Sequence, residues 1–274
     1  MERIQLAINK AREARQLVQP KTQTAANETP DQAPRSDQSR EDAWNGLTPF
    51  KPDTKHMSKS RIAAYHTGAD AIPFDVMRTK LLYQMRANTW RRVAITSPGM
   101  ACGKTMVSLN LAFSLARQSD IKVMVIELDM RRPSMARVLG LKNKHLFAKV
   151  LEGNAEPQDH IIRYGSNLAF ATNHSPAQNP AELLQGKDGA AVLDAIEARY
   201  QPDVMIFDMP PMLVSDDTMA FLDQVDCGLL IGAAESTSIE EIENCEKEMA
   251  SRTNVMGVVL NKCRYLDKPE NYGY

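Results

Sequence analysis

The sequence predicts an α/β fold in which helices cover both faces of a doubly wound, mainly parallel sheet. Short, uninterrupted apolar runs of strand length recur along the chain, and segments with helical spacing of apolar residues separate them. Uninterrupted apolar strands are typical of parallel sheets, because helices bury both of their faces. The composition is that of a globular protein, since 43% of the 274 residues are hydrophobic and 24% are charged.

Strands and helices alternate in the part of the chain that follows Trp90. The runs predicted to be strands are RRVAITSP, KVMVIELD, NLAFAT, DVMIFDM, CGLLIGAA and NVMGVVLN. Apolar residues recur at helical spacing over residues 74–85, 107–117, 190–200 and 239–251, and the stretch before Leu151 is also rich in helix.

The chain divides into five predicted segments. Residues 19–43 contain no Leu, Ile, Val, Met or aromatic residue, so this stretch cannot bury enough surface to order itself. The apolar stripe before it predicts a short amphipathic helix that either docks to a partner or frays. The segments are an amphipathic helix over 1–18, a disordered linker over 19–43, a strand-and-coil lead-in over 44–73, the main domain over 74–263 and a tyrosine-containing tail over 264–274.

Charge and cysteine content exclude several classes of protein. The 33 Lys and Arg residues nearly balance the 34 Asp and Glu residues, so we expect no binding of nucleic acid through bulk charge. The four cysteines form no C-x-x-C pair and predict neither a disulfide framework nor a zinc site. No signal peptide or membrane-spanning stretch is recognisable, so a cytoplasmic location is expected.

A phosphate-binding loop is the most informative motif. Residues 93–105 read VAITSPGMACGKT, which places a loop ending in GKT between a predicted strand and a predicted helix. Backbone N–H groups of such a loop surround phosphate oxygens, while Lys104 reaches the β and γ phosphates and the Thr105 hydroxyl ligates Mg²⁺. Pro98 occupies the first glycine position of the consensus. The residues expected to bind nucleotide here are Gly99, Met100, Ala101, Cys102, Gly103, Lys104, Thr105 and Met106.

Three carboxylates follow other predicted strands. Glu127 and Asp129 end the run KVMVIELD, and Asp208 ends the run DVMIFDM. Ligands of open parallel sheets bind at the carboxyl ends of the strands, so these acids are expected near Lys104. Any one of them alone could instead be a helix cap or a turn residue.

Taken in order, TSPGMACGKT, IELDMRRPS, HSPAQNPAELL, IFDMPPMLVSDD and VVLNK resemble the MinD/ParA-like P-loop NTPases, and among them the bacterial tyrosine kinases of capsule and exopolysaccharide synthesis. The resemblance implies a P-loop kinase domain that uses ATP and Mg²⁺. It assigns nucleotide binding to Lys104, metal binding to Thr105, Asp129 and Asp208, and adenine recognition to Asn261.

The same resemblance implies a catalytic set of Lys104, Glu127, Asp129 and Asp208, in which Glu127 or Asp129 orients or deprotonates the tyrosine hydroxyl. Glu127 stands where this family usually has Asp. Gly99 occupies the position of the signature lysine of MinD and ParA proteins, which favours the kinase branch. In the helix over 74–85, only Arg78 matches the family's E-x-x-R-x-x-R packing motif.

Three tyrosines lie in the last ten residues, Tyr265, Tyr272 and Tyr274, and the resemblance implies that they are autophosphorylation sites. The predicted function is an ATP-dependent protein-tyrosine kinase that forms a homo-oligomer and controls exopolysaccharide synthesis or export. Its expected partner is a membrane-anchored polysaccharide co-polymerase or activator, which would bring it to the inner membrane. Two alternatives stay open, namely a MinD/ParA-like ATPase and a nucleotide-binding regulator with little catalysis.

Overall fold

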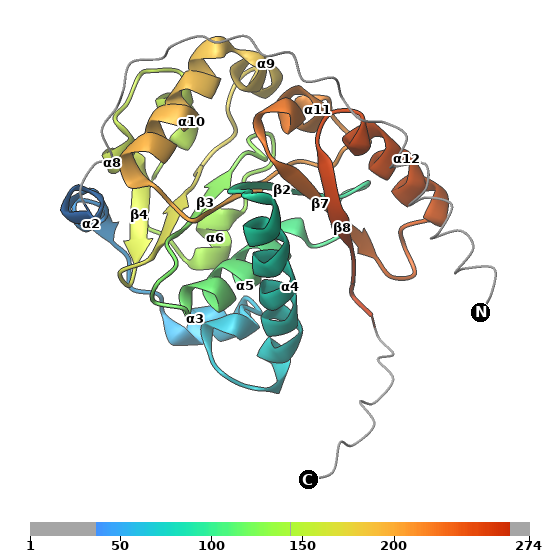
Figure 1. Ribbon diagram of the computed structural model, residues 1–274, viewed down its shortest axis with the longest axis horizontal. Coiled ribbons are helices and arrows are strands. Elements are labelled where there is room, and N and C mark those ends of the chain that lie inside the picture. The colour runs from blue at the N-terminus through green and yellow to red at the C-terminus, as the bar shows by residue number, and fades with distance from the viewer. Residues whose placement is uncertain (1–36, 143, 264–274) are drawn as a thin grey trace. The chain divides into compact units, whose positions relative to one another are not determined.

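The computed structural model describes residues 37–142 and 144–263, and it shows one eight-stranded sheet (Figure 1). The strand order is β1-β4-β5-β3-β6-β2-β7-β8. All neighbouring pairs run parallel except β4 and β5, which are antiparallel. The strands are β1 (Thr48–Pro49), β2 (Arg92–Thr96), β3 (Val123–Glu127), β4 (Ile161–Tyr164), β5 (Leu168–Ala171), β6 (Val204–Asp208), β7 (Cys227–Ala233) and β8 (Asn254–Asn261).

Helices cover both faces of this sheet, so the predicted doubly wound α/β fold is confirmed. One core cluster includes side chains of α4, α5 and α6, and the other includes side chains of α7, α10, α11 and α12. The helices are α2 (Asp37–Asn45), α3 (Thr54–Lys59), α4 (Ile72–Asn88), α5 (Lys104–Ala116), α6 (Met135–Leu139), α7 (Phe147–Leu151), α8 (Pro157–His160), α9 (Pro180–Gln185), α10 (Lys187–Tyr200), α11 (Asp217–Phe221) and α12 (Ile239–Ala250), with 3₁₀ turns η1 (Ala63–Tyr65), η2 (Ala69–Ala71) and η3 (Leu222–Gln224).

The structure has a helix in part of the predicted linker. Helix α2 begins at Asp37 and therefore occupies the end of the stretch 19–43. Its composition is polar, and it is held by contacts from outside the helix. Arg40 pairs with Asp203 at 2.7 Å, and Glu41 pairs with Lys122 at 2.8 Å. The linker prediction is wrong for residues 37–43, and the remainder of it lies outside the described residues, as does the predicted helix over 1–18.

Trp44, in the last turn of α2, is fully buried. Its indole N–H donates to the Tyr200 carbonyl at 2.7 Å, and its ring meets the Tyr200 ring edge-on. Burial of an indole with its N–H satisfied contributes strongly to stability. The lead-in over 44–73 also contains more helix than the predicted strand and coil, because Asp53 caps α3 by accepting hydrogen bonds from the backbone N–H groups of Lys55 and His56.

The carboxyl ends of the central strands meet at one edge of the sheet. In the register, Asp208 lies beside Ile95 of β2 on one side and beside Glu127 of β3 on the other. The loop after β2 and the acidic ends of β3 and β6 are thus neighbours, as the sequence predicts.

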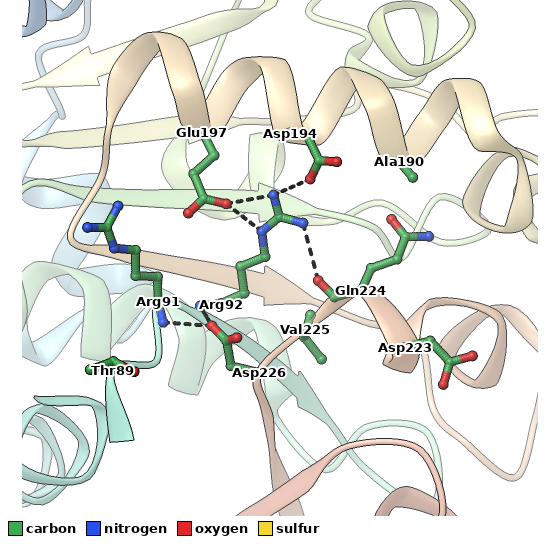
Figure 2. Close-up of a pocket in the computed structure, with 10 residues that line it drawn as sticks. All are labelled: Thr89, Arg91, Arg92, Ala190, Asp194, Glu197, Asp223, Gln224, Val225 and Asp226. Atoms are coloured by element: carbon green, nitrogen blue, oxygen red, sulfur yellow. Dashed lines mark hydrogen bonds and ion pairs between the residues drawn. The ribbon is translucent and has the colours of Figure 1, made fainter. Parts of the chain in front are cut away.

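A cavity of about 500 Å³ lies at the other edge, where β2 and β7 begin (Figure 2). Arg92 extends towards α10, and its guanidinium pairs with Asp194 and Glu197, each at 2.6 Å. Asp226 accepts hydrogen bonds from the backbone N–H groups of Arg91 and Arg92. These charged groups bind one another and fasten α10 to the sheet, so they form a structural cluster.

The four cysteines are free. Within the described ranges, no helix is both long enough and apolar enough to cross a membrane.

Candidate active site

The loop between β2 and α5 has the backbone shape of an anion-binding loop. Ala101 has φ +60° and Gly103 has φ +97°, so the chain turns twice through the left-handed region before α5 begins at Lys104. For a residue with a side chain this conformation costs about 1–2 kcal/mol, and Ala101 adopts it. The turns bring backbone N–H groups together at a helix N-terminus, and such an arrangement binds phosphate.

Asn261, the last residue of β8, lies against this loop. Its side-chain amide donates to the Cys102 carbonyl at 2.8 Å. A Cβ added at Gly103 would collide with that amide, so both the positive φ and the close approach of Asn261 require glycine. The predicted nucleotide residue Asn261 is therefore at the loop, although the sequence places it far from Gly103.

Asp208 is completely buried beneath the loop. Its Oδ1 accepts a hydrogen bond from the Ser108 hydroxyl at 3.2 Å, and its Oδ2 has no hydrogen-bond partner among the described residues. Burial raises the pKa of Asp208 to about 6, although Thr105 and the positive charge of Lys104 act in the opposite direction. An unpartnered buried carboxylate oxygen beside a Thr hydroxyl and a lysine suits a bound cation.

Asp129 supplies a second carboxylate and lines the cavity itself. Its backbone N–H donates to the Asp208 carbonyl at 3.0 Å, which fixes the two chain segments together. Burial raises its pKa, and the neighbouring Lys104 charge offsets part of this increase. Two carboxylates and one hydroxyl are the sparse oxygen ligand set that Mg²⁺ accepts when phosphates and water complete its shell.

Glu127 is placed differently from the prediction. It is fully buried, its Oε1 accepts from the N–H groups of Ser134 and Met135 at 2.6 and 2.7 Å, and its Oε2 accepts from the N–H of Asn173 at 2.8 Å. Burial raises its pKa to about 7 despite these three hydrogen bonds. Glu127 is not among the residues that line the cavity, so its carboxylate is not placed to contact a substrate hydroxyl.

A cavity of about 610 Å³ opens over the loop and Asp129. Two of its lining residues are joined by a hydrogen bond, since the Ser134 hydroxyl lies 3.3 Å from the Thr105 hydroxyl. The lining residues are Met100, Ala101, Gly103, Lys104, Thr105, Met106, Asp129, Arg131, Arg132, Ser134, Arg137, Val138, Pro210, Pro211, Val214 and Ser215.

Seven of the twelve residues predicted for nucleotide binding, metal binding and catalysis line this cavity. Those that line it are Met100, Ala101, Gly103, Lys104, Thr105, Met106 and Asp129, while Gly99, Cys102, Asn261, Asp208 and Glu127 are not in the lining. Cys102 is 3% exposed and directs its thiol to the Gly99 carbonyl. The three predicted phosphorylation sites, Tyr265, Tyr272 and Tyr274, lie outside the described residues.

Sequence reasoning missed several residues that shape the site. Ser108, which holds Asp208, lies one helical turn after Lys104, and that spacing could have revealed it. Asn173 lies two residues after the end of β5. Its side-chain oxygen accepts a hydrogen bond from the Ala148 N–H, and its own backbone N–H donates to Glu127. Arg137, on α6, carried no signal in the sequence beyond its charge.

Comparison with known proteins identifies the fold family. Residues 89–271 match the profile of the ParA family, whose description is "NUBPL iron-transfer P-loop NTPase", and this match spans more than half of the chain. The chain belongs to the ParA family of P-loop NTPases. The predicted membership of the MinD/ParA-like superfamily is therefore confirmed.

Within this ParA family, the curated relatives include bacterial tyrosine kinases. The chain is 26% identical to the putative tyrosine-protein kinase CapB of Staphylococcus aureus and 28% identical to the tyrosine-protein kinase YwqD of Bacillus subtilis. These matches cover 73% of this chain and 87% and 84% of those proteins. It is 29% identical to the tyrosine-protein kinase etk of Escherichia coli, where the match covers 68% of this chain and 25% of that protein. The chain thus spans most of CapB and YwqD but about a quarter of etk.

Solved structures agree with these relatives. The kinase domain of Escherichia coli ETK has a TM-score of 0.66 and 27% identity, and the match covers 75% of this chain and 81% of that domain. The VpsO kinase domain has a TM-score of 0.61 and 26% identity, with 70% and 96% covered. MinD of Pyrococcus horikoshii with Mg-ADP, at 18% identity and a TM-score of 0.52 over 62% of this chain and 69% of that one, shows the shared fold alone. The resemblance to bacterial tyrosine kinases that the motifs indicate is confirmed.

Proposed function

We propose that this protein is an ATP-dependent protein-tyrosine kinase that phosphorylates itself and controls exopolysaccharide or capsule synthesis or export. The observation that carries the proposal is the unpartnered, buried Oδ2 of Asp208 beneath a phosphate-binding loop that begins a helix at Lys104. The named tyrosine kinases among the relatives support the choice of tyrosine as the acceptor.

The site residues fit ATP and Mg²⁺. Backbone N–H groups of the loop from Gly99 to Thr105 would hold the phosphates, and the largely buried Lys104 would neutralise charge at the β and γ phosphates. Thr105, Asp129 and Asp208 would hold the metal, which supplies further neutralisation of charge on the transferring phosphoryl group. Asn261 would lie beside the nucleotide, as the family resemblance implies.

The chemical step is an in-line displacement. The oxygen of the tyrosine hydroxyl forms a bond to the γ-phosphorus while the bond from that phosphorus to the β–γ bridging oxygen breaks, and ADP leaves. Asp129 is the carboxylate in the cavity lining, so it is the group placed to orient the hydroxyl and accept its proton. Glu127 would act indirectly by fixing the backbone after Asp129.

The likeness to CapB and etk also supports a partnership with a membrane-anchored polysaccharide co-polymerase or activator and assembly into a homo-oligomer. The segment 1–36 would add a second contact to that partner, which raises the local concentration of the kinase at the inner membrane. Co-fractionation with membranes should then weaken when residues 1–36 are removed, while nucleotide binding persists. Equal fractionation of the two forms would eliminate a docking role for this segment.

ATP labelled in the γ-phosphate tests the proposed activity. A kinase transfers the label to protein tyrosine, a MinD/ParA-like ATPase releases it only as free phosphate, and a nucleotide-binding regulator does neither. Label recovered on tyrosine would support the proposal, and label recovered only in free phosphate would replace it with the ATPase function.

A further inference from the structure

Several cationic side chains line this cavity. They are Lys104, Arg131, Arg132 and Arg137, and Asp129 is the one carboxylate in the lining. Lys104 is committed to the nucleotide phosphates by its place in the loop. The three arginines are the other cations of the lining.

Arg131 forms ion pairs within the protein. Its guanidinium forms a two-pronged pair with the fully buried carboxylate of Asp217, with contacts of 2.7 and 2.9 Å, and Asp216 lies 3.7 Å away. Arg132 and Arg137 are exposed, and neither forms an ion pair with a carboxylate in the described part of the chain. Two guanidinium groups without a carboxylate partner in the described residues thus line a cavity that already contains the phosphate-binding Lys104.

Arg137 is carried by a firmly held element. Glu127 accepts the backbone N–H groups of Ser134 and Met135 at the start of α6. At the other end, His56 Nε2 lies 3.1 Å from each of the carbonyl oxygens of Arg137 and Val138, and because both are acceptors this nitrogen carries the proton. A helix fixed at both ends presents its side chains at defined positions, as a selective site requires.

Part of the cavity wall is apolar. Its residues are Val138, which follows Arg137 on α6, and Pro210, Pro211 and Val214. An aromatic ring can pack against such a wall, whereas a guanidinium in the same cavity suits a carboxylate. The ligand that matches both features is a tyrosine with an acidic residue nearby.

We propose that Arg137, with Arg132, selects tyrosines that have an acidic residue two positions away. This inference rests on the proposed kinase function. In an extended peptide, residues two apart project to the same side and lie about 7 Å apart, so phenol and carboxylate can enter one cavity together. Arg132 contacts the Met100 thioether on the loop side while Arg137 stands on α6, so a carboxylate on either side of the tyrosine can meet a guanidinium.

The tail of the chain has this pattern. Asp267 follows Tyr265 by two positions, and Glu270 precedes Tyr272 by two positions. Two positions before Tyr274 stands Tyr272, which is not acidic. The proposal therefore ranks Tyr265 and Tyr272 above Tyr274 as phosphate acceptors.

Synthetic peptides of residues 262–274 test this selection with the full-length kinase. One peptide keeps Tyr272 and Glu270 with the other tyrosines replaced by Phe, and its partner carries Glu270→Gln. The acidic peptide should be phosphorylated with a kcat/KM about tenfold higher, the size expected of one charge-assisted hydrogen bond. Fluorescence anisotropy of labelled peptide in the presence of Mg-ADP should show the same ranking in Kd.

The variants Arg137→Gln and Arg132→Gln complete the test. In at least one of them the preference for the acidic peptide should fall to less than threefold, while Kd for fluorescent ADP stays within twofold of wild type. Arg86→Gln is the matched control, because Arg86 is an exposed arginine of α4 that lines neither cavity. It should keep the full preference.

The outcomes separate this inference from the proposed function. A wild-type kinase that phosphorylates both peptides equally would overturn the selection and leave the kinase function standing. A second contrary result would be that the arginine variants lose kcat/KM equally on both peptides and bind ADP more weakly. That result would show that the arginines bind the nucleotide, and it would also overturn the proposed selection. Failure of the wild type to phosphorylate any tyrosine, including its own, would contradict the proposed function itself.

Discussion

Asn261 at the end of β8 donates a hydrogen bond to the carbonyl of Cys102, 159 residues earlier in the chain. This contact joins the edge strand of the sheet to the phosphate-binding loop and places the Asn261 amide over Gly103. The final strand therefore helps to set the shape of the loop.

Gly103→Ala should strongly weaken nucleotide binding. The methyl group would collide with Asn261, and alanine at φ +97° adds backbone strain of about 1–2 kcal/mol. Titration with fluorescent ADP measures the loss, which we expect to exceed tenfold. Gly68→Ala is the control, because nothing lies within 4 Å of an added Cβ there, and it should bind like the wild type. Normal binding by Gly103→Ala would show that the loop can adjust.

Binding of Mg-ADP should weaken in acid. Asp208 has a pKa raised to about 6 by burial, so it gains a proton below that pH and can no longer hold the metal. Affinity should be constant above about pH 7 and fall by up to about tenfold per pH unit below 6. Asp208→Asn should bind weakly and lose this pH dependence. Isothermal titration at several pH values measures both effects, and an equally steep decline in the variant would assign it to another group.

Glu127→Gln distinguishes a positioning role from a reacting one. The amide oxygen can still accept from Ser134 and Met135, but its NH₂ group would face the Asn173 N–H, which costs about 1–3 kcal/mol of stability. At a temperature where the variant is folded, kinase activity should fall less than tenfold. Loss of a direct proton acceptor would reduce it by about 10²–10⁴. A loss in that range from a folded variant would restore the catalytic assignment of Glu127.

Truncations on either side of α2 should differ in stability. Removing residues 1–36 leaves α2 intact, whereas removing residues 1–43 deletes the partners of Asp203 and of Lys122, whose side chain is 8% exposed. We expect the shorter protein to lose about 1–2 kcal/mol in the free energy of unfolding relative to the longer one, because Asp203 and Glu41 are half-exposed and each pair contributes little. Urea denaturation followed by Trp fluorescence measures the difference. Equal midpoints would show that α2 contributes little.

The tail tyrosines should be the main autophosphorylation sites. Changing Tyr265, Tyr272 and Tyr274 to Phe should remove most phosphotyrosine while the affinity for ADP stays unchanged, because none of them is among the loop residues. Phosphotyrosine-specific detection and mass spectrometry measure the result. Undiminished phosphorylation in this triple variant would move the acceptor sites elsewhere.

Local patterns predicted the sheet and the loop well, because strand, loop and helix signals are contiguous there. The uninterrupted apolar runs marked six of the strands, and GKT after the first of them located Lys104 and Thr105. The short strand β4 was missed, and β1 was expected only as part of the strand-and-coil lead-in over 44–73. β4 pairs antiparallel with β5 over only four residues, and such a short segment has little periodicity to detect.

Tertiary contacts explain the remaining differences. Helix α2 has a polar sequence and exists because Arg40, Glu41 and Trp44 bind residues far along the chain. Glu127 was predicted to be catalytic because it ends a strand and lies two residues before Asp129. In the structure its carboxylate instead accepts hydrogen bonds from three backbone N–H groups. Neither relationship can be read from neighbouring residues, since each depends on how distant segments pack.

A single-turnover reaction tests the kinase account most directly. Full-length protein in excess over γ-labelled ATP and Mg²⁺ is quenched at intervals, and ADP, free phosphate and phosphotyrosine are each quantified. The account predicts about one phosphotyrosine for each ADP formed in the wild type and almost none of either product in Lys104→Met, which keeps the apolar stem but lacks the ammonium group. ADP formed with an equal amount of free phosphate and no phosphotyrosine would contradict it.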